Sequence, residues 1–309
     1  MSKKDDGPLG FTVSQWRLFI IVLVIGLSAI LFHALQRNGI ANSAALYVGL
    51  PFLFALGLSL TPKTKSTMGA TLKGLTIALL LSAPLFMEGF ICILMASPIL
   101  YSVAALYAWV VGRAKRAKDL NSKVQLSALT LLLAFASLEG TNENLTFDRS
   151  NQVEYSSTID ADIAFVRKQL AEPSIPSQSR PAFLKVFPLP VDMSGQGIDV
   201  GDERHLDFVY KKWFFSNVHK GSTIFRVAES RNDYIRFDIP HDDSYISHYL
   251  TWTASEVFLE PTVEGKTNIT WRLGYERKLD PIWYFGPMQN YAAWLTAKVL
   301  VENTANAKF

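Results

Sequence analysis

The sequence predicts two parts of different fold class, an α-helical membrane domain over residues 1–140 and an α+β domain over residues 153–309. Long apolar runs separated by short basic loops, confined to the first half, predict the membrane helices. In the second half, side chains of alternating polarity predict the strands of an antiparallel sheet. A helical run closes the chain, and we expect the sheet to curve around that helix. Residues 141–152 are polar and are predicted to form a linker.

Charge is unevenly distributed along the chain. The 309 residues carry 30 Lys and Arg against 27 Asp and Glu, which gives a net charge of +3. Residues 1–150 hold 13 basic and 7 acidic residues and residues 151–309 hold 17 and 20, so the halves carry +6 and −3. The basic residues of the first half lie between apolar runs, which is typical of membrane topology and not of a nucleic-acid surface. We therefore expect no nucleic-acid partner.

Five apolar runs of the first half approach the ~20 residues needed to cross a bilayer. Residues 70–111 are too long for one span, and Met87-Glu88-Gly89 is the predicted break between two. The last run is the shortest. The five predicted transmembrane helices are Arg17–Leu35, Ser43–Leu60, Ala70–Met87, Phe90–Val111 and Val124–Leu138.

The basic loops predict the orientation of these helices. Residues 63–73 and 113–123 are separated by two spans and share a side with the basic N terminus. Arg37 is the only basic residue in the opposite loops before the fifth span. Because basic loops mark the cytoplasmic side, we expect an integral protein of the plasma or inner membrane with a cytoplasmic N terminus and an extracytoplasmic C-terminal domain. If the short fifth run only dips into the membrane, that domain is cytoplasmic instead.

The C-terminal domain is predicted to begin with a strand and a short helix. Apolar and polar side chains alternate over Val153–Ile159, and Asp160 is a suitable N-cap for a helix over Ile163–Leu170. Glu172–Pro190 is rich in proline and serine and predicts a loop with at most one helical turn. Turn residues then separate five further strands, predicted at Arg204–Tyr210, Thr223–Ser230, Asp233–Ile239, Tyr245–Glu260 and Lys266–Glu276.

The last of these strands has the clearest pattern in the sequence. Ile269, Trp271, Leu273 and Tyr275 fall on one face, which is typical of a half-buried strand. The segment 279–281 ends the pairing, because proline has no N–H to donate to a ladder. Helical spacing follows from Met288 to about residue 303. Strands followed by a long helix predict an α+β domain with its helices on one face of the sheet.

Three stretches are informative together: the opening VEYSSTIDADIAFVRKQL, a central Val200-Gly201, and the ending GKTNITWRLGYERKLDPIWYFGP before the long helix. They resemble the START-like superfamily, the helix-grip group also known as polyketide cyclase/dehydrase or SRPBCC. The resemblance covers about Val153–Ala305 and none of the first half. It implies a cavity for apolar or amphipathic ligands between the curved sheet and the C-terminal helix. That family shares no catalytic residues, so it implies none here.

Several aromatic side chains are candidates for lining such a cavity, and packing in a filled core is the alternative for each. Arg204 and His248 are candidates for fixing the polar head of a ligand, with salt bridges or surface exposure as alternatives. The aromatic candidates are Phe225, Phe237, Tyr249, Trp252, Trp271 and Tyr275.

The chain contains no GxGxxG, P-loop, GxSxG or HExxH stretch. A zinc site built from residues 241–243 and His248 is conceivable, but a solvated hairpin turn accounts better for those side chains. The single cysteine, Cys92, lies in an apolar run and excludes a disulfide within the chain. We therefore predict no catalytic residue, metal or cofactor.

The segment Lys211-Lys212-Trp213-Phe214-Phe215 is a candidate membrane contact. Three consecutive aromatic residues cannot all face a core from a regular strand, because alternate side chains point to opposite faces. Lysine beside tryptophan suits a bilayer interface. The alternative is a long strand with both faces packed.

These observations leave three functions, in decreasing order of preference. The first is a membrane-anchored domain that binds a lipid or other hydrophobic small molecule. The second is a non-enzymatic membrane protein whose domain docks an unspecified protein partner, and the third is a cyclase or hydrolase on the same fold. A cavity of several hundred Å³ favours binding or catalysis over docking, and convergent titratable groups favour catalysis.

Overall fold

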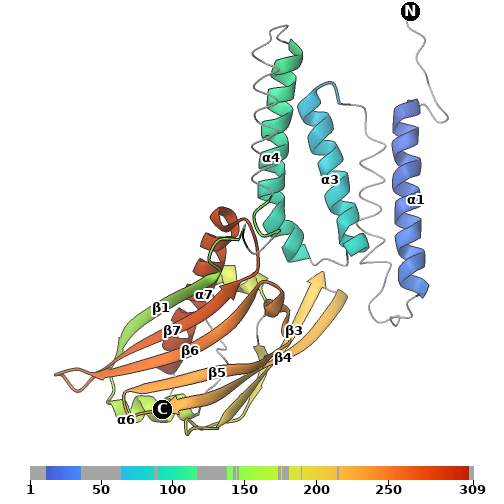
Figure 1. Cartoon of the computed structure of the whole chain (residues 1–309). Helices are drawn as coiled ribbons and strands as arrows, with labels where there is room; N and C mark the ends of the chain where they lie inside the picture. The colour runs from blue at the N-terminus through green and yellow to red at the C-terminus, as the bar shows by residue number, and fades with distance from the viewer. Residues whose placement is uncertain are drawn as a thin grey trace, which may run out of the picture. The chain divides into compact units, whose positions relative to one another are not determined.

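The computed structural model describes residues 12–35, 64–86, 90–116, 138–141, 144, 146–172, 175, 181–188, 190–213 and 216–305 (Figure 1). The chain forms two compact units. The N-terminal unit comprises Met1–Ser137 together with Lys211–Val218, and the C-terminal unit comprises Leu138–Tyr210 and His219–Phe309.

The N-terminal unit contains three described helices, α1 (Val13–Leu35), α3 (Thr67–Phe86) and α4 (Phe90–Arg116). The described residues hold one helix that is long and apolar enough to cross a membrane, Ile91–Arg113, and two shorter apolar helical stretches, Val13–Val24 and Thr67–Ser82. The expectation of five transmembrane helices is therefore not supported. The predicted spans 43–60 and 124–138 lie outside the described residues, except for Leu138. The predicted break at residues 87–89 agrees with the ends of α3 and α4.

Side-chain contacts join the three described helices. Val22 of α1 packs on Ile77 and Leu81 of α3, and the hydroxyls of Thr76 and Tyr101 hydrogen-bond at 2.6 Å between α3 and α4. Many large apolar side chains of α1 and α4 are nevertheless exposed, among them Ile20, Ile21, Val24, Leu94, Leu106 and Trp109.

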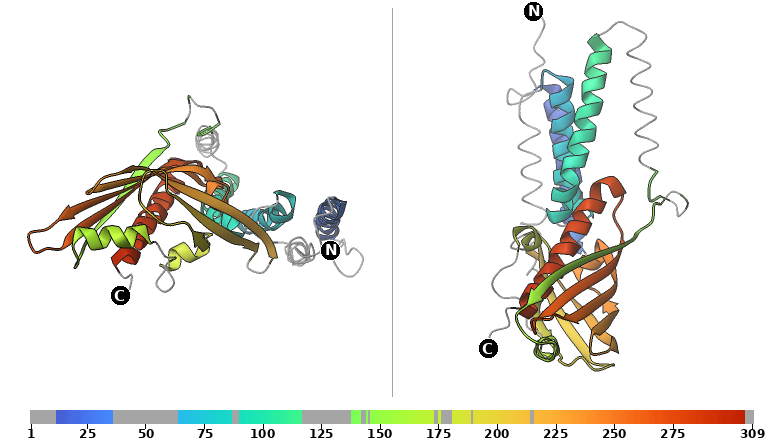
Figure 2. Two further views of the ribbon diagram at one scale, coloured as in Figure 1. Left: turned by 90° about the horizontal axis from the view of Figure 1, so that it is seen from below. Right: turned by 90° about the vertical axis from the view of Figure 1, so that its left-hand side faces the viewer.

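The C-terminal unit is built on one antiparallel sheet of seven strands in the order β1-β7-β6-β5-β4-β3-β2. The sheet curves around the long helix α7 (Ile282–Ala305), as both views of Figure 2 show. A curved antiparallel half-barrel with a C-terminal helix fits the helix-grip architecture. The strands are β1 (Ser150–Ile159), β2 (Pro190–Ser194), β3 (Glu203–Trp213), β4 (Ser216–Ser230), β5 (Tyr234–Asp242), β6 (Leu250–Pro261) and β7 (Thr267–Arg277). Three short helices complete it, α6 (Ile163–Ala171), η4 (Ala182–Val186) and η5 (Tyr245–His248).

β7 has the alternation that the sequence predicts. Residues 267, 269, 271, 273, 275 and 277 are buried, while the residues between them are more exposed. β7 lies between β1 and β6, where Trp271 is opposite Tyr155 on one side and Val257 on the other. Its buried face packs against Ala293, Ala297 and Val301 in one hydrophobic core with α7. The strand and its apolar face are thus confirmed.

The N-cap of α6 differs from the prediction. Asp162, not Asp160, occupies this position, and its Oδ1 accepts a hydrogen bond from the backbone N–H of Phe165 at 2.8 Å. The side chain of Asp160 instead projects into solvent, at 90% exposure. The cap residue must immediately precede the first helical residue, and Asp162 is the carboxylate at that position.

α7 begins at Ile282 and not at Met288, so Pro287 lies inside the helix. The backbone N–H of Ile282 donates to Oε1 of Glu139 at 2.7 Å. This acceptor satisfies a helix N-terminal donor that has no partner within the helix. Because the cap comes from residue 139, the local sequence gave no indication of the earlier start.

The predicted strand Tyr245–Glu260 is interrupted, because η5 precedes β6. Asp242 turns the chain there. Its Oδ1 accepts hydrogen bonds from the backbone N–H and the hydroxyl of Ser244, at 3.0 and 2.6 Å. β2 was not predicted, because it is an edge strand of only five residues and begins at the end of the proline-rich segment.

Candidate ligand-binding site

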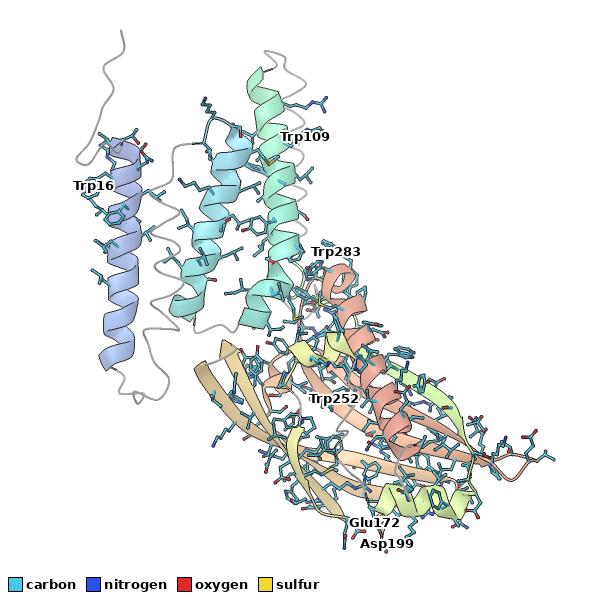
Figure 3. The ribbon with its side chains drawn as sticks, turned by 180° about the vertical axis from the view of Figure 1, so that it is seen from behind. Trp16, Trp109, Glu172, Asp199, Trp252 and Trp283 are labelled. Carbon is cyan, nitrogen blue, oxygen red and sulfur yellow. The ribbon has the colours of Figure 1, made fainter. Side chains whose placement is uncertain are left out.

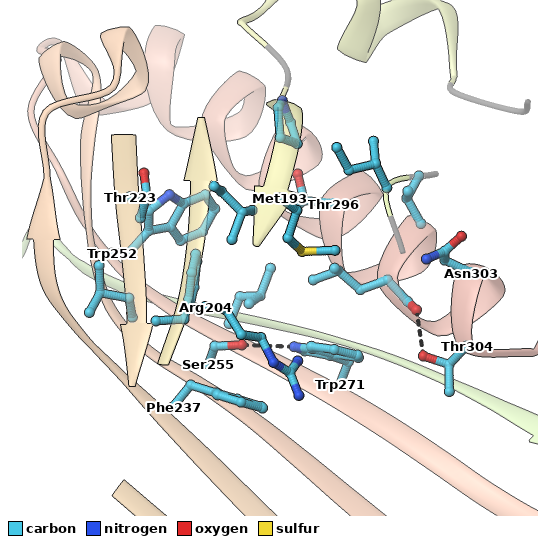
Figure 4. Close-up of a pocket in the computed structure, with 18 of the residues that line it drawn as sticks. Met193, Arg204, Thr223, Phe237, Trp252, Ser255, Trp271, Thr296, Asn303 and Thr304 are labelled. Carbon is cyan, nitrogen blue, oxygen red and sulfur yellow. Dashed lines mark hydrogen bonds between the residues drawn. The ribbon is translucent and has the colours of Figure 1, made fainter. Parts of the chain in front are cut away.

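A cavity of about 220 Å³ lies between the concave face of the sheet and the C-terminal half of α7 (Figure 4). Strands β3 to β7 supply most of its walls, and α6, η4 and the segments around them close one side. Most lining side chains are apolar. The sheet contributes Leu206, Phe208, Phe225, Phe237, Ile239, Trp252, Trp271 and Leu273, the helix contributes Val299 and Leu300, and the connecting segments contribute Ile175, Leu184 and Pro188.

Five of the eight candidate cavity residues line this space: Arg204, Phe225, Phe237, Trp252 and Trp271. The other three do not. Tyr275 is buried beside Trp252, with 6.1 Å between the ring centroids, and burial raises the pKa of its hydroxyl. Tyr249 is buried as well, and its backbone carbonyl accepts from Nε2 of Gln289 at 2.7 Å. His248, at the end of η5, is exposed and is not among the residues that line the cavity.

Four polar side chains of the lining donate hydrogen bonds to acceptors within the protein. Nε1 of Trp271 donates to Oγ of Ser255 at 2.9 Å, and the hydroxyl of Thr223 donates to Oδ1 of Asp242 at 2.9 Å. On α7, Thr296 and Thr304 donate to backbone carbonyls one turn earlier, at 2.9 and 3.0 Å. These groups therefore present apolar surface to the cavity and leave little unsatisfied polarity.

Arg204 is the exception among the lining residues. Its side chain enters the cavity from β3 and is only 6% exposed (Figure 4). The guanidinium stacks on the ring of Phe237, 4.7 Å from its centroid. Nη2 donates to the carbonyls of Leu170 and Gly197, the latter at 2.9 Å, whereas Nε is buried without a partner. Burial lowers the pKa of Arg204 to about 10, and the nearby carboxylate of Asp202 opposes that shift.

The loop before β3 fixes the position of Arg204. Gly197 has φ +96, and a Cβ at this position would lie 2.0 Å from Oδ2 of Asp202. Only glycine fits there without strain. The N–H of Gly197 donates to the carbonyl of Ala171 at 2.7 Å, which holds the loop against the end of α6. Nη2 of Arg204 then bonds to both the helix and the loop.

Several lining residues were not predicted. Ser255, Leu184 and Thr304 come from three separate elements. The helical spacing of residues 296, 299, 300, 303 and 304 on one face of α7 is the sequence signal that could have indicated them. Two further lining residues, Trp252 on the sheet and Glu172 at the end of α6, are labelled in Figure 3.

The side chains considered as zinc ligands make other contacts. Oδ1 of Asp243 accepts from the backbone N–H and the hydroxyl of Ser222, and lies 3.5 Å from Nε2 of His241. Within the described part of the chain, no group of three or more His, Cys, Asp or Glu side chains could hold a metal ion.

The candidate membrane segment is described only in part. Lys211 is exposed near the end of β3. Lys212 and Trp213 belong to β3, but their side chains, and all of Phe214 and Phe215, lie outside the described residues.

No protein-family model and no curated protein matches the chain. Solved structures of START and polyketide-cyclase type are similar to its C-terminal half. A START superfamily protein from Mycobacterium smegmatis is 17% identical, with 49% of this chain and 92% of that chain covered and a TM-score of 0.33. Zhui aromatase/cyclase from Streptomyces sp. R1128 is 8% identical, with 50% and 93% covered and a TM-score of 0.32. Major latex-like protein 151 from Panax ginseng is 11% identical, with 50% and 98% covered and a TM-score of 0.29. At these identities and scores the similarity does not extend to function.

Proposed function

We propose that the C-terminal domain binds a lipid or another hydrophobic small molecule in the cavity between the sheet and α7. The observation that carries the proposal is the cavity itself, which is walled by aromatic and aliphatic side chains and whose polar groups are mostly satisfied internally. Burying apolar ligand surface against such walls stabilises a complex by roughly 25 cal/mol per Å² before the cost of ordering the ligand.

The size of the cavity limits the ligand. Pockets for drug-sized molecules usually measure ~300–1,000 Å³, and this cavity of about 220 Å³ lies below that range. A molecule with a single alkyl chain or a small ring system fits this volume better than a diacyl lipid. A larger lipid would have to leave part of its length outside.

The cavity also favours ligand binding over the two alternative functions, partner docking and catalysis. A domain that only docks a protein partner requires no internal space. A proton-transferring enzyme requires titratable groups that converge on the substrate, and the described lining contains two titratable side chains, Arg204 and the exposed Glu172. Binding is therefore preferred over both docking and catalysis.

We extend the proposal to the location of the domain, at the surface of a membrane. The helix Ile91–Arg113 is long and apolar enough to cross a bilayer and is mostly exposed. In the C-terminal unit, Glu139 directly follows the last predicted span and is bonded to the start of α7. Trp283, in the next position of that helix, is 63% exposed. An exposed tryptophan suits the bilayer interface.

The orientation and the contact through Lys211–Phe215 remain parts of this proposal. A reporter fused after Phe309 is expected to be active outside the cytoplasm. Activity in the cytoplasm alone would contradict the predicted topology.

The binding proposal is tested by mass spectrometry of small molecules that co-purify with the detergent-extracted full chain. Ala254 lines the cavity, so Ala254→Leu is expected to fill it and to reduce the bound molecule strongly. Ala228 lies exposed on β4, and Ala228→Leu is the matched control. Equal amounts of the same molecule in both folded variants would contradict a site in this cavity.

A further inference from the structure

We infer that the ligand of this cavity carries an anionic head group, a carboxylate or a phosphate, and that Arg204 binds it. The inference rests on the proposed function and specifies the chemistry of the molecule bound. The preferred ligand is therefore a single-chain amphiphile with a negatively charged end.

The first observation is a buried charge for which no ion pair is found among the described contacts, although the carboxylate of Asp202 is near enough to act on it electrostatically. Arg204 is 6% exposed, and removal of a guanidinium from water is unfavourable unless a counter-charge or a full set of acceptors replaces the water. The ion pairs of the described residues involve other arginines, namely Arg149, Arg226, Arg231, Arg236, Arg272 and Arg277. A bound anion would supply the missing charge.

The second observation is an unused donor. Nη2 of Arg204 is satisfied by two backbone carbonyls, but Nε is buried without an acceptor. Among the described lining residues, it is the only buried side-chain nitrogen or oxygen atom without a hydrogen-bond partner. A carboxylate or phosphate oxygen is the acceptor that forms the strongest hydrogen bond with a guanidinium.

The surrounding groups are compatible with an anion. Phe237 covers one face of the guanidinium, and the Trp271–Ser255 pair lies beside it (Figure 4). Of the nearby carboxylates, Asp202 accepts from the backbone N–H of Asp199 at 2.8 Å, and Glu172 is exposed at the rim of the cavity. Neither forms an ion pair with Arg204 among the described contacts.

A purely structural role would also explain part of this geometry, because Arg204 joins the end of α6 to the Gly197 loop. Carbonyl acceptors at a helix C terminus stabilise a cation there. That role uses only Nη2, and it does not require the side chain to line a cavity or to leave Nε without a partner. Ligand selectivity therefore separates the two explanations.

The experiment measures binding of radiolabelled decanoate, decyl phosphate, 1-decanol and decyltrimethylammonium to the immobilised full chain in mild detergent. The parent protein is expected to prefer decanoate and decyl phosphate over decanol by about tenfold or more, the effect of one hydrogen bond to a charged group. The cationic probe is expected to bind most weakly.

Two substitutions assign the preference to Arg204. Arg204→Gln is expected to bring the decanoate-to-decanol ratio close to one while decanol still binds, and Arg204→Lys is expected to retain part of the preference. Arg226→Gln, on the exposed side of the sheet, is the matched control and should leave the ratio unchanged. Thermal denaturation of each variant identifies any that fails to fold.

The outcomes separate the two proposals. If no probe binds the parent protein, the proposed function itself fails. If decanol binds as tightly as decanoate to the parent protein, the cavity binds apolar molecules but the anionic head group is wrong. That comparison needs no variant, so it holds even if Arg204→Gln does not fold. A preference that survives in folded Arg204→Gln would assign the head group to another side chain.

Discussion

Arg277 and Arg204 are both buried in the C-terminal unit, at 1% and 6% exposure, but their surroundings differ. Arg277 continues the buried face of β7, and its Nη1 donates to the carboxylate of Asp280. Arg149 donates to the other oxygen of the same carboxylate. Arg204 has no such carboxylate and bonds to backbone carbonyls.

The difference separates a structural charge from one available to a ligand. The Arg277–Asp280 pair lies next to the first turn of α7, where it joins the end of β7 to the start of that helix. Arg204 lines the cavity instead. Both arginines join elements of the fold, but only Arg277 does so through a carboxylate in direct contact. For Arg204, a molecule in the adjacent space can supply the counter-charge.

The largest expected effect comes from removing the carboxylate of the paired site. Asp280→Ala leaves Arg277 and Arg149 without their shared partner, and breaking a buried pair typically costs ~3–5 kcal/mol. Chemical denaturation of the parent and variant proteins measures this. Asp238→Ala removes the exposed partner of Arg236 and is the matched control, expected to cost ~0–1 kcal/mol. Similar losses in the two variants would show that the Asp280 pair is not a special contact.

The second effect is the loss of the unpaired arginine. Arg204→Met leaves the carbonyls of Leu170 and Gly197 without this donor, which typically costs ~1–3 kcal/mol. Removal of a desolvated charge partly offsets that cost, so the loss should be smaller than for Asp280→Ala. The same denaturation series checks the order. A larger loss for Arg204→Met would indicate that Arg204 is mainly a structural clamp.

The third effect is a pH dependence specific to Arg204. Its pKa in the folded protein is lowered from the ordinary, higher value to about 10, chiefly by burial. Above pH 10 the unfolded chain therefore binds more protons than the folded one, so the stability of the parent protein relative to Arg204→Met should rise with pH. The expected gain is about 1 kcal/mol between pH 9 and pH 11. Denaturation of both proteins at the two pH values measures the difference, and a constant difference would contradict the lowered pKa.

The sequence allowed the prediction of local patterns and not of distant partners. The two-residue period of β7 correctly predicted a strand with one buried face. Arg277 shares that face with Trp271 and Tyr275, yet a charged side chain at the end of such a row would usually be exposed. Its burial depends on Asp280 and Arg149, and Arg149 is more than a hundred residues away in the chain. No local pattern contains that information.

The candidate site shows the same limit. Trp252 and Trp271 were candidates because large aromatic residues in alternating strands usually face a core, and both line the cavity. His248 was grouped with Arg204 by residue chemistry alone, but the turn at Asp242 and Ser244 places it on the separate helix η5. Arg204 could be identified as a candidate from the sequence, whereas the absence of a counter-charge required the structure.

A third arginine gives the smallest expected effect and completes the comparison. Arg226 is 54% exposed and pairs with Glu203 at 2.6 Å, so both charges remain largely hydrated. Arg226→Ala is expected to lower the free energy of unfolding by ~0–1 kcal/mol. The loss is small because two exposed charges are almost as stable when each is hydrated separately as when they are paired. This small cost should decrease in 1 M salt, where the screening length is ~3 Å. Denaturation at low and high salt measures the change. A loss comparable to that of Asp280→Ala would mean that burial is not what distinguishes the three arginines, since an exposed pair would then stabilise the fold as strongly as a buried one.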